Sequence, residues 1–68
     1  MKISEIAFRF SSALRQLRRD NNKYEIAYLQ QYVRDEMFRA IKTRIPAQEY
    51  YMQTKHVIME TLGRKDIA

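Results

Sequence analysis

The clearest chemistry in this sequence comes from its arginines. Several of them follow the Ala13-Leu14 step, and two more occur near the middle of the chain. A guanidinium group is always charged, and its planar set of donors matches the two oxygens of a carboxylate or phosphate. We therefore expect an acidic partner, held by Arg15, Arg18, Arg19, Arg34 and Arg39.

Positive charge is concentrated at the start of the chain. Residues 1–23 hold six Lys or Arg against two acids, whereas residues 46–68 are electrically neutral, so the first third carries most of the net charge of +5. A local positive field attracts acidic proteins, phosphates and nucleic acids, and it speeds their association in a salt-dependent way. The charge alone does not choose among these partners.

The remaining titratable residues do not predict an enzyme. The chain has no cysteine and a single histidine, His56, which cannot assemble a zinc site from imidazoles. Asp35 and Glu36 are adjacent and therefore diverge on a helix, and no glycine-rich phosphate loop is present. We expect a binding protein with no metal site and no directly bound cofactor.

The apolar residues that must position these arginines recur at three- and four-residue steps, which is typical of helices. This spacing predicts helices over about residues 4–19, 24–43 and 46–62. The second helix has the widest apolar surface, so we expect it to lie centrally and to continue without a break near Tyr32. The side chains expected to point inward are Phe10, Leu14, Leu17, Ile26, Leu29, Val33, Met37, Tyr51, Ile58 and Leu62.

Local signals mark the ends of these helices. Ser4 is the expected N-cap of the first helix, and Asn22 with Glu25 has the form of a capping box that opens the second. Pro46 suits the first position of the third helix because it lacks a backbone donor. Gly63, the only glycine, is expected just past the end of that helix, where a positive φ has no steric cost.

Short connections between helices predict antiparallel neighbours. The expected fold is therefore all-α: an up-down-up antiparallel three-helix bundle that forms a single domain over residues 1–68. A domain of this length buries only ~60% of its unfolded surface. We expect the isolated chain to be weakly folded and to gain stability from its partner by mass action.

The order of these motifs resembles the LYR-motif proteins, a family of small basic three-helix mitochondrial proteins. The resemblance covers residues 6–62 and rests on the run 13–19 (Ala-Leu-Arg-Gln-Leu-Arg-Arg), on Tyr32-Val33-Arg34 and on Phe38-Arg39. The chain departs from the family pattern at the Leu-Tyr-Arg triplet, where it offers Arg9-Phe10-Ser11 or Ala7-Phe8-Arg9 instead. The similarity is nearest to the short members that serve the mitochondrial ribosome or assemble complex V.

The resemblance implies a function. LYR-motif proteins bind the acidic mitochondrial acyl carrier protein, whose acidic helix and 4′-phosphopantetheine phosphate meet the arginines while the acyl chain inserts among the helices. In this chain the implied lining of the acyl chain or core is Phe10, Leu14, Leu17, Val33, Met37 and Phe38. The implied role is that of an assembly factor or accessory subunit of a larger complex, ribosome or respiratory chain, in the mitochondrial matrix.

Other interpretations remain open at this point. The basic residues could contact nucleic acid, with the tyrosines stacking on bases, or the chain could be a viral or phage helical adaptor. Residues 2–19 are amphipathic and basic like a mitochondrial targeting helix, yet they fit the outer face of an ordinary helix as well. No stretch approaches the ~20 apolar residues of a membrane span, so none is expected.

Overall fold

The structure is a computed structural model that describes residues 2–18 and 23–67, with side chains as far as Gly63. It contains three helices, α1 (Ile3–Leu17), α2 (Lys23–Thr43) and α3 (Ala47–Ile67), and no strand occurs in the described ranges. The predicted all-helical fold with three helices is confirmed. Helix α2 is also continuous through Tyr32, as expected.

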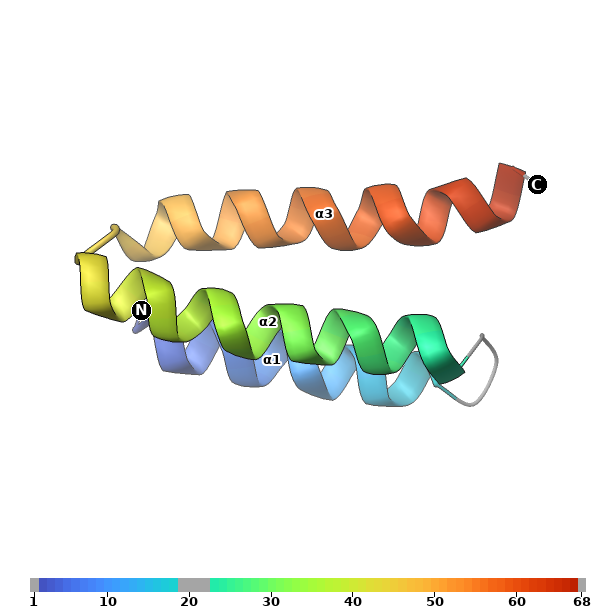
Figure 1. The fold of residues 1–68 in the computed structure, drawn as a ribbon, viewed down its shortest axis with the longest axis horizontal. Helices are drawn as coiled ribbons and strands as arrows, with labels where there is room; N and C mark the ends of the chain where they lie inside the picture. Colours follow the sequence, from blue (N-terminus) through green and yellow to red (C-terminus); the bar gives the residue numbers. More distant parts are fainter. Residues whose placement is uncertain (1, 19–22, 68) are drawn as a thin grey trace.

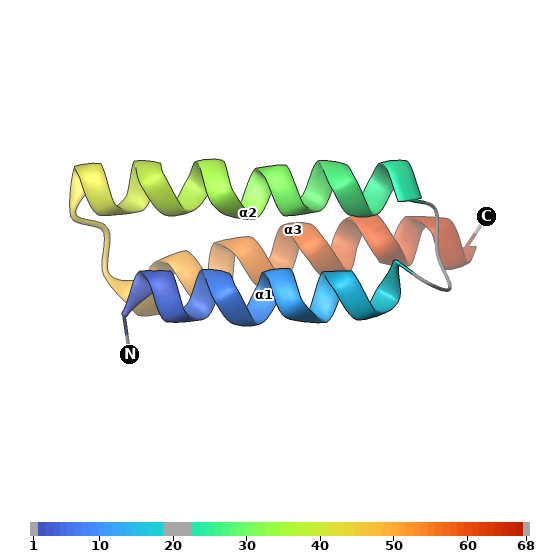
Figure 2. The ribbon, with the colours of Figure 1, turned by 90° about the horizontal axis from the view of Figure 1, so that it is seen from below.

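The helices lie roughly parallel to one long axis. Helices α1 and α2 run side by side in opposite directions, and their interface is the most extensive of the three (Figure 2). Helix α3 packs against both of them from one side (Figure 1). The start of α1, the end of α2 and the start of α3 therefore meet at one end of the molecule.

The core is a line of apolar side chains on the facing stripes of the three helices. Ile26, Leu29 and Val33 of α2 are completely buried, and α2 contacts both other helices. Each such side chain contributes about 1.5–3 kcal/mol through its removal from water. The buried apolar set is Ile6, Ala7, Leu14, Ile26, Leu29, Val33, Ala40, Tyr50 and Ile58.

Two side chains that were expected to point inward are largely exposed. Tyr51 is 38% exposed because the neighbouring Tyr50, about 100° around the helix, takes the core position. Leu17 is 37% exposed because it lies in the last turn of α1, at the end of the packed stripe. Phe10, Met37 and Leu62 are partly buried and pack against the edge of the core.

Helix α1 begins one residue earlier than predicted and without a side-chain cap. The N-cap residue is Lys2, so the prediction of Ser4 as the cap was wrong. The Lys2 carbonyl oxygen accepts hydrogen bonds from the backbone N–H groups of Glu5 and Ile6 at 3.1 and 3.2 Å. The capping box predicted at Asn22 lies outside the described residues.

Helix α2 ends in a Schellman motif that the sequence did not reveal. The N–H of Ile45 donates to the carbonyl oxygen of Ala40 at 2.9 Å, and the N–H of Arg44 donates to that of Ile41 at 3.3 Å. Arg44 has a φ of 57°, the left-handed conformation that this motif requires. Pro46 follows directly, and α3 begins one residue after it, at Ala47.

The predicted end of α3 at Gly63 was wrong. The helix continues through Gly63 to Ile67, and the glycine does not have a positive φ. A glycine inside a helix costs only about 1 kcal/mol relative to alanine, and the following Arg64 and Lys65 are good helix formers. The local preference for helix therefore outweighs the single stop signal.

Candidate partner-binding face

Two rows of side chains form the surface of α1 and α2 that is turned away from α3, toward the viewer in Figure 2. Residues in each row are separated by alternating steps of four and three, which keeps them on one side of a helix. We call this surface the α1/α2 face; its α1 row is Ser4, Phe8, Ser11, Arg15 and Arg18, and its α2 row is Ala27, Gln31, Arg34, Phe38 and Ile41. Neither row contains an acidic residue.

A shallow hollow joins the two rows. It has a volume of about 220 Å³ and brings Phe8 and Ser11 of α1 together with Arg34 and Met37 of α2. Because the two helices run in opposite directions, Arg15 and Arg18 lie near the first half of α2, on the side of the hollow away from Ile41. Arg34 therefore occupies the middle of the face.

One half of the α1/α2 face is apolar and unusually exposed. Phe8 is 72% exposed, Phe38 60% and Ile41 51%. Phe38, which the resemblance implies as a lining of the acyl chain or core, is not part of the core: it lies four residues after Arg34 and shares that outward row. Adjacent exposed aromatic and aliphatic side chains of this kind are typical of interaction surfaces.

Arg39 does not belong to this face. It follows Arg34 by five residues, which turns it about 140° around the helix toward α3. Its guanidinium contacts the Glu36 carboxylate through Nη2 at 2.7 Å and Nε at 3.0 Å. This hydrogen bonding raises the pKa of Arg39, as do the nearby charges of Glu36 and, on α3, Glu49.

The predicted binding arginines are therefore divided. Arg15, Arg18 and Arg34 are exposed and share the α1/α2 face, and none of them has an ion-pair partner among the described residues. Arg39 is held by Glu36 on another side of α2, because its five-residue separation from Arg34 turns it about 140° around the helix. Arg19 lies outside the described residues.

The residues implied as an acyl-chain lining are also divided. Leu14 and Val33 are buried, Phe10 and Met37 are partly buried, and Leu17 and Phe38 are exposed. The Phe10 ring stacks on Tyr51, with centroids 5.6 Å apart, and meets Tyr50 edge-on at 6.5 Å. A chain entering between the helices would therefore have to displace packed side chains.

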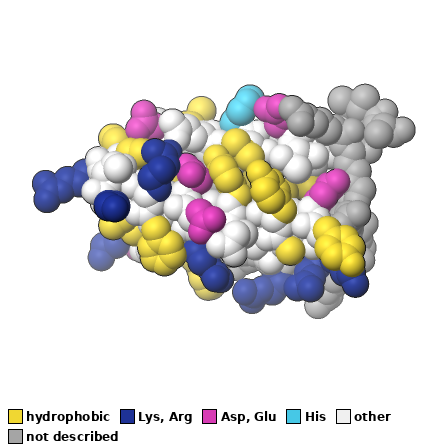
Figure 3. Space-filling model, in the orientation of Figure 1, with side chains coloured by type: hydrophobic (Ala, Val, Ile, Leu, Met, Phe, Trp, Pro, Cys, Tyr) yellow, Lys and Arg dark blue, Asp and Glu magenta, His cyan; other side chains and the backbone are white. Residues whose placement is uncertain are grey.

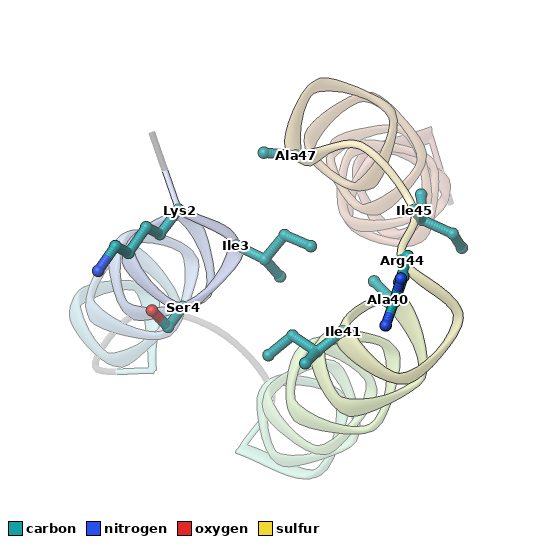
Figure 4. Close-up of a pocket in the computed structure, with 8 residues that line it drawn as sticks. All are labelled: Lys2, Ile3, Ser4, Ala40, Ile41, Arg44, Ile45 and Ala47. Carbon is teal, nitrogen blue, oxygen red and sulfur yellow. The ribbon is translucent and has the colours of Figure 1, made fainter.

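A hollow that sequence reasoning missed lies where the three helix ends meet. It has a volume of about 430 Å³, and Figure 4 shows Ile3, Ile41 and Ala47 pointing toward it from different helices. Lys2 and Arg44 also line it. The sequence feature that could have indicated this hollow is the pair Ala40 and Ala47, because their small side chains leave space on both sides of the connection between α2 and α3.

The surface shared by α2 and α3 has a different character. Acidic side chains interrupt its hydrophobic patches, whereas lysines and arginines follow the left and lower edges of the same view (Figure 3). The only histidine, His56, pairs with Glu60 at 3.1 Å on α3. The lower edge of this view borders the α1/α2 face.

Within the described ranges, no group of three or more His, Cys, Asp or Glu side chains could hold a metal ion. None of the helices in these ranges is both long and apolar enough to cross a membrane. No family model, curated protein or solved structure matches the chain.

Proposed function

We propose that this protein is a non-catalytic helical adaptor that binds an acidic protein through the α1/α2 face. The observation that carries the proposal is the exposure of Arg15 and Arg18 on the α1 row and of Arg34 on the α2 row, two rows that contain no acid and that a shared hollow joins at Phe8, Ser11 and Arg34. Guanidinium groups without an internal carboxylate partner remain available for carboxylates of another protein. Arg39, held by Glu36, serves the fold instead.

The proposed partner is an acyl carrier protein of the mitochondrial type, as the resemblance to the LYR-motif family implies. In this proposal the chain is an up-down-up three-helix bundle of the mitochondrial matrix, and it serves as an assembly factor or accessory subunit of a ribosome or respiratory complex. The acidic helix of the carrier protein lies along the arginines, and its phosphopantetheine phosphate binds a further basic side chain. The exposed Phe8 and Phe38 give the complex an apolar contact beside the charged one.

The test is isothermal titration of the purified chain with acylated mitochondrial acyl carrier protein. Hydrogen bonds to charged groups are worth ~1.5–3 kcal/mol when well formed and less where they stay exposed. The double substitution Arg15→Glu with Arg34→Glu should therefore weaken binding by about 100-fold or more, and rising salt should weaken the wild-type complex. Helical content should not change, because both side chains are exposed.

The matched control is Arg9→Glu. Arg9 is an exposed arginine of the same helix, but it lines a hollow with Ala47 and Gln48 on the α3 side. This variant should bind the carrier protein nearly as well as the wild type. Equal weakening by the control and the double variant would show that only net charge matters, and binding that survives the double variant would contradict the proposal.

The rival partner is nucleic acid, which the exposed Tyr24 and Tyr28 at the start of α2 could contact by stacking. Titrating the same variants with a mixed-sequence single-stranded RNA separates the two partners. We expect no tight RNA binding by the wild type. Strong RNA binding that Arg15→Glu and Arg34→Glu abolish, with no binding of the carrier protein, would replace the proposed partner.

A further inference from the structure

Resting on the proposed function, we propose that the acidic partner presents a helix of about three turns whose carboxylates and apolar side chains are segregated toward opposite ends. The α1/α2 face has the same division. Its apolar half is Phe8, Phe38 and Ile41, and its basic half is Arg15 and Arg18. Arg34 stands between the halves, beside Phe8 in the shared hollow.

The dimensions of the face favour a helix. From Phe8 to Arg18 the α1 row extends over ten residues, which is about 15 Å along the helix axis, or close to three turns. Two side-by-side helices leave a groove between them, and a third helix fits into such a groove. Helix α3 already lies against the opposite side of the α1/α2 pair, so the partner helix would complete a four-helix arrangement.

The chemistry of the face sets the order of side chains on the partner. Carboxylates placed over Phe8 and Phe38 would find only Arg34 as a charged donor, at the border of the apolar half, so most of them would lose water without gaining a partner, which is costly. Apolar residues placed over Arg15 and Arg18 would remove water from guanidinium groups without supplying a counter-charge. The segregated order is the one in which both halves of the face are matched.

The probes are two synthetic helical peptides of equal length and identical composition. In the segregated peptide, glutamates occupy one end of the binding stripe and leucine and phenylalanine occupy the other; in the mixed peptide, the same residues alternate along the stripe. Binding to the full chain is measured by fluorescence anisotropy. We expect the segregated peptide to bind about 10-fold more tightly, since a tenfold ratio is ~1.4 kcal/mol and a few well-placed contacts supply it.

Two double variants locate the effect. Phe8→Ser with Phe38→Ser should remove the preference for the segregated peptide. The matched control is Met52→Ser with Met59→Ser, which removes two side chains of α3 that are 57% and 61% exposed and should leave the preference intact. All four side chains are mostly exposed, so neither variant should alter helical content.

Each outcome bears on a different claim. Equal affinity for the two peptides, or a preference that survives in the phenylalanine variant, would overturn the segregated-helix inference. If Arg15→Glu with Arg34→Glu nevertheless abolishes binding of the acyl carrier protein, the proposed function is retained and only the inference about the partner helix is lost. Unchanged peptide binding by Arg15→Glu with Arg34→Glu would also overturn the inference, whereas unchanged binding of the acyl carrier protein by the same variant would overturn the proposed function.

Discussion

The Tyr50 hydroxyl donates a hydrogen bond of 3.0 Å to the backbone carbonyl oxygen of Val33. Both residues are buried, and the bond joins the first turn of α3 to the middle of α2. It joins a side chain of α3 to the backbone of α2 across the interface between these two helices. The bond therefore fixes the position of α3 along α2, which apolar contacts alone would fix less precisely.

Replacement of Tyr50 by phenylalanine should lower the free energy of unfolding by about 1 kcal/mol. The ring would remain in the core, so the main loss is the buried hydrogen bond to Val33, and a bond of this kind is worth about 0.5–1.5 kcal/mol. Urea denaturation followed by circular dichroism measures the change. A variant as stable as the wild type would show that the bond contributes nothing to the packing of α3.

The same hydroxyl predicts a loss of stability in alkali. Burial raises the pKa of Tyr50 from 10.0 to about 12, with Thr54 acting in the opposite direction through a side-chain hydrogen bond. The folded state holds this proton more tightly than the unfolded state. The contribution of the neutral Tyr50 hydroxyl to the free energy of unfolding is therefore complete below pH ~10 and is lost as the pH rises through ~12. We expect the free energy of unfolding to fall by roughly 1–2 kcal/mol over this range, after allowance for screening by solvent.

The control for this prediction is the phenylalanine variant measured over the same pH range. Other groups also titrate in alkali, including Tyr32, whose pKa is raised by burial and by Glu36. The difference in stability between wild type and Tyr50→Phe isolates the Tyr50 contribution. A difference that does not shrink between pH 10 and 12 would contradict the assignment.

Arg44→Gly should stabilise the chain. A left-handed φ costs a residue with a side chain roughly 1–2 kcal/mol, whereas glycine adopts it freely. Glycine also makes the unfolded chain more flexible, so the net gain should be about 0.5–1 kcal/mol. Arg44→Ala keeps the strained backbone and should give no gain; an equal gain in both variants would indicate an effect of charge rather than of conformation.

Gly63→Ala should also stabilise the chain, for the opposite reason. Gly63 is helical, and a methyl group added there would meet no atom within 4 Å. Alanine is preferred to glycine inside a helix by about 1 kcal/mol. Thermal denaturation of the variant should show a raised midpoint. A lowered midpoint would mean that the helix does end at this glycine, as the sequence alone suggested.

The fold was predictable because apolar periodicity is strong in α1 and α2. The stripe through Ile26, Leu29 and Val33 located the centre of the core correctly. The helix ends were less predictable, since Arg44 adopts a conformation that glycine usually supplies and Gly63 does not. A Schellman motif depends on backbone hydrogen bonds, which residue types alone do not determine.

The candidate site was predictable only in part. The exposure of Arg15, Arg18 and Arg34 was predictable from the polar stripe of each helix. Their grouping needed the pairing of α1 with α2, which also brings Phe8 into the surface. Arg39 could have been set aside from its spacing, since five residues separate it from Arg34 and Glu36 lies one turn before it.

The most direct test of the α1/α2 face is the mapping of amide chemical-shift changes by NMR as acylated acyl carrier protein is added to the isotopically labelled chain. We predict the largest changes at Phe8, Arg15, Arg34 and Phe38, with little change at Met52, His56 and Met59 on the outer side of α3. These two groups are similarly exposed, so access to solvent does not bias the comparison. Changes concentrated on α3, or no changes at saturating carrier protein, would contradict the account.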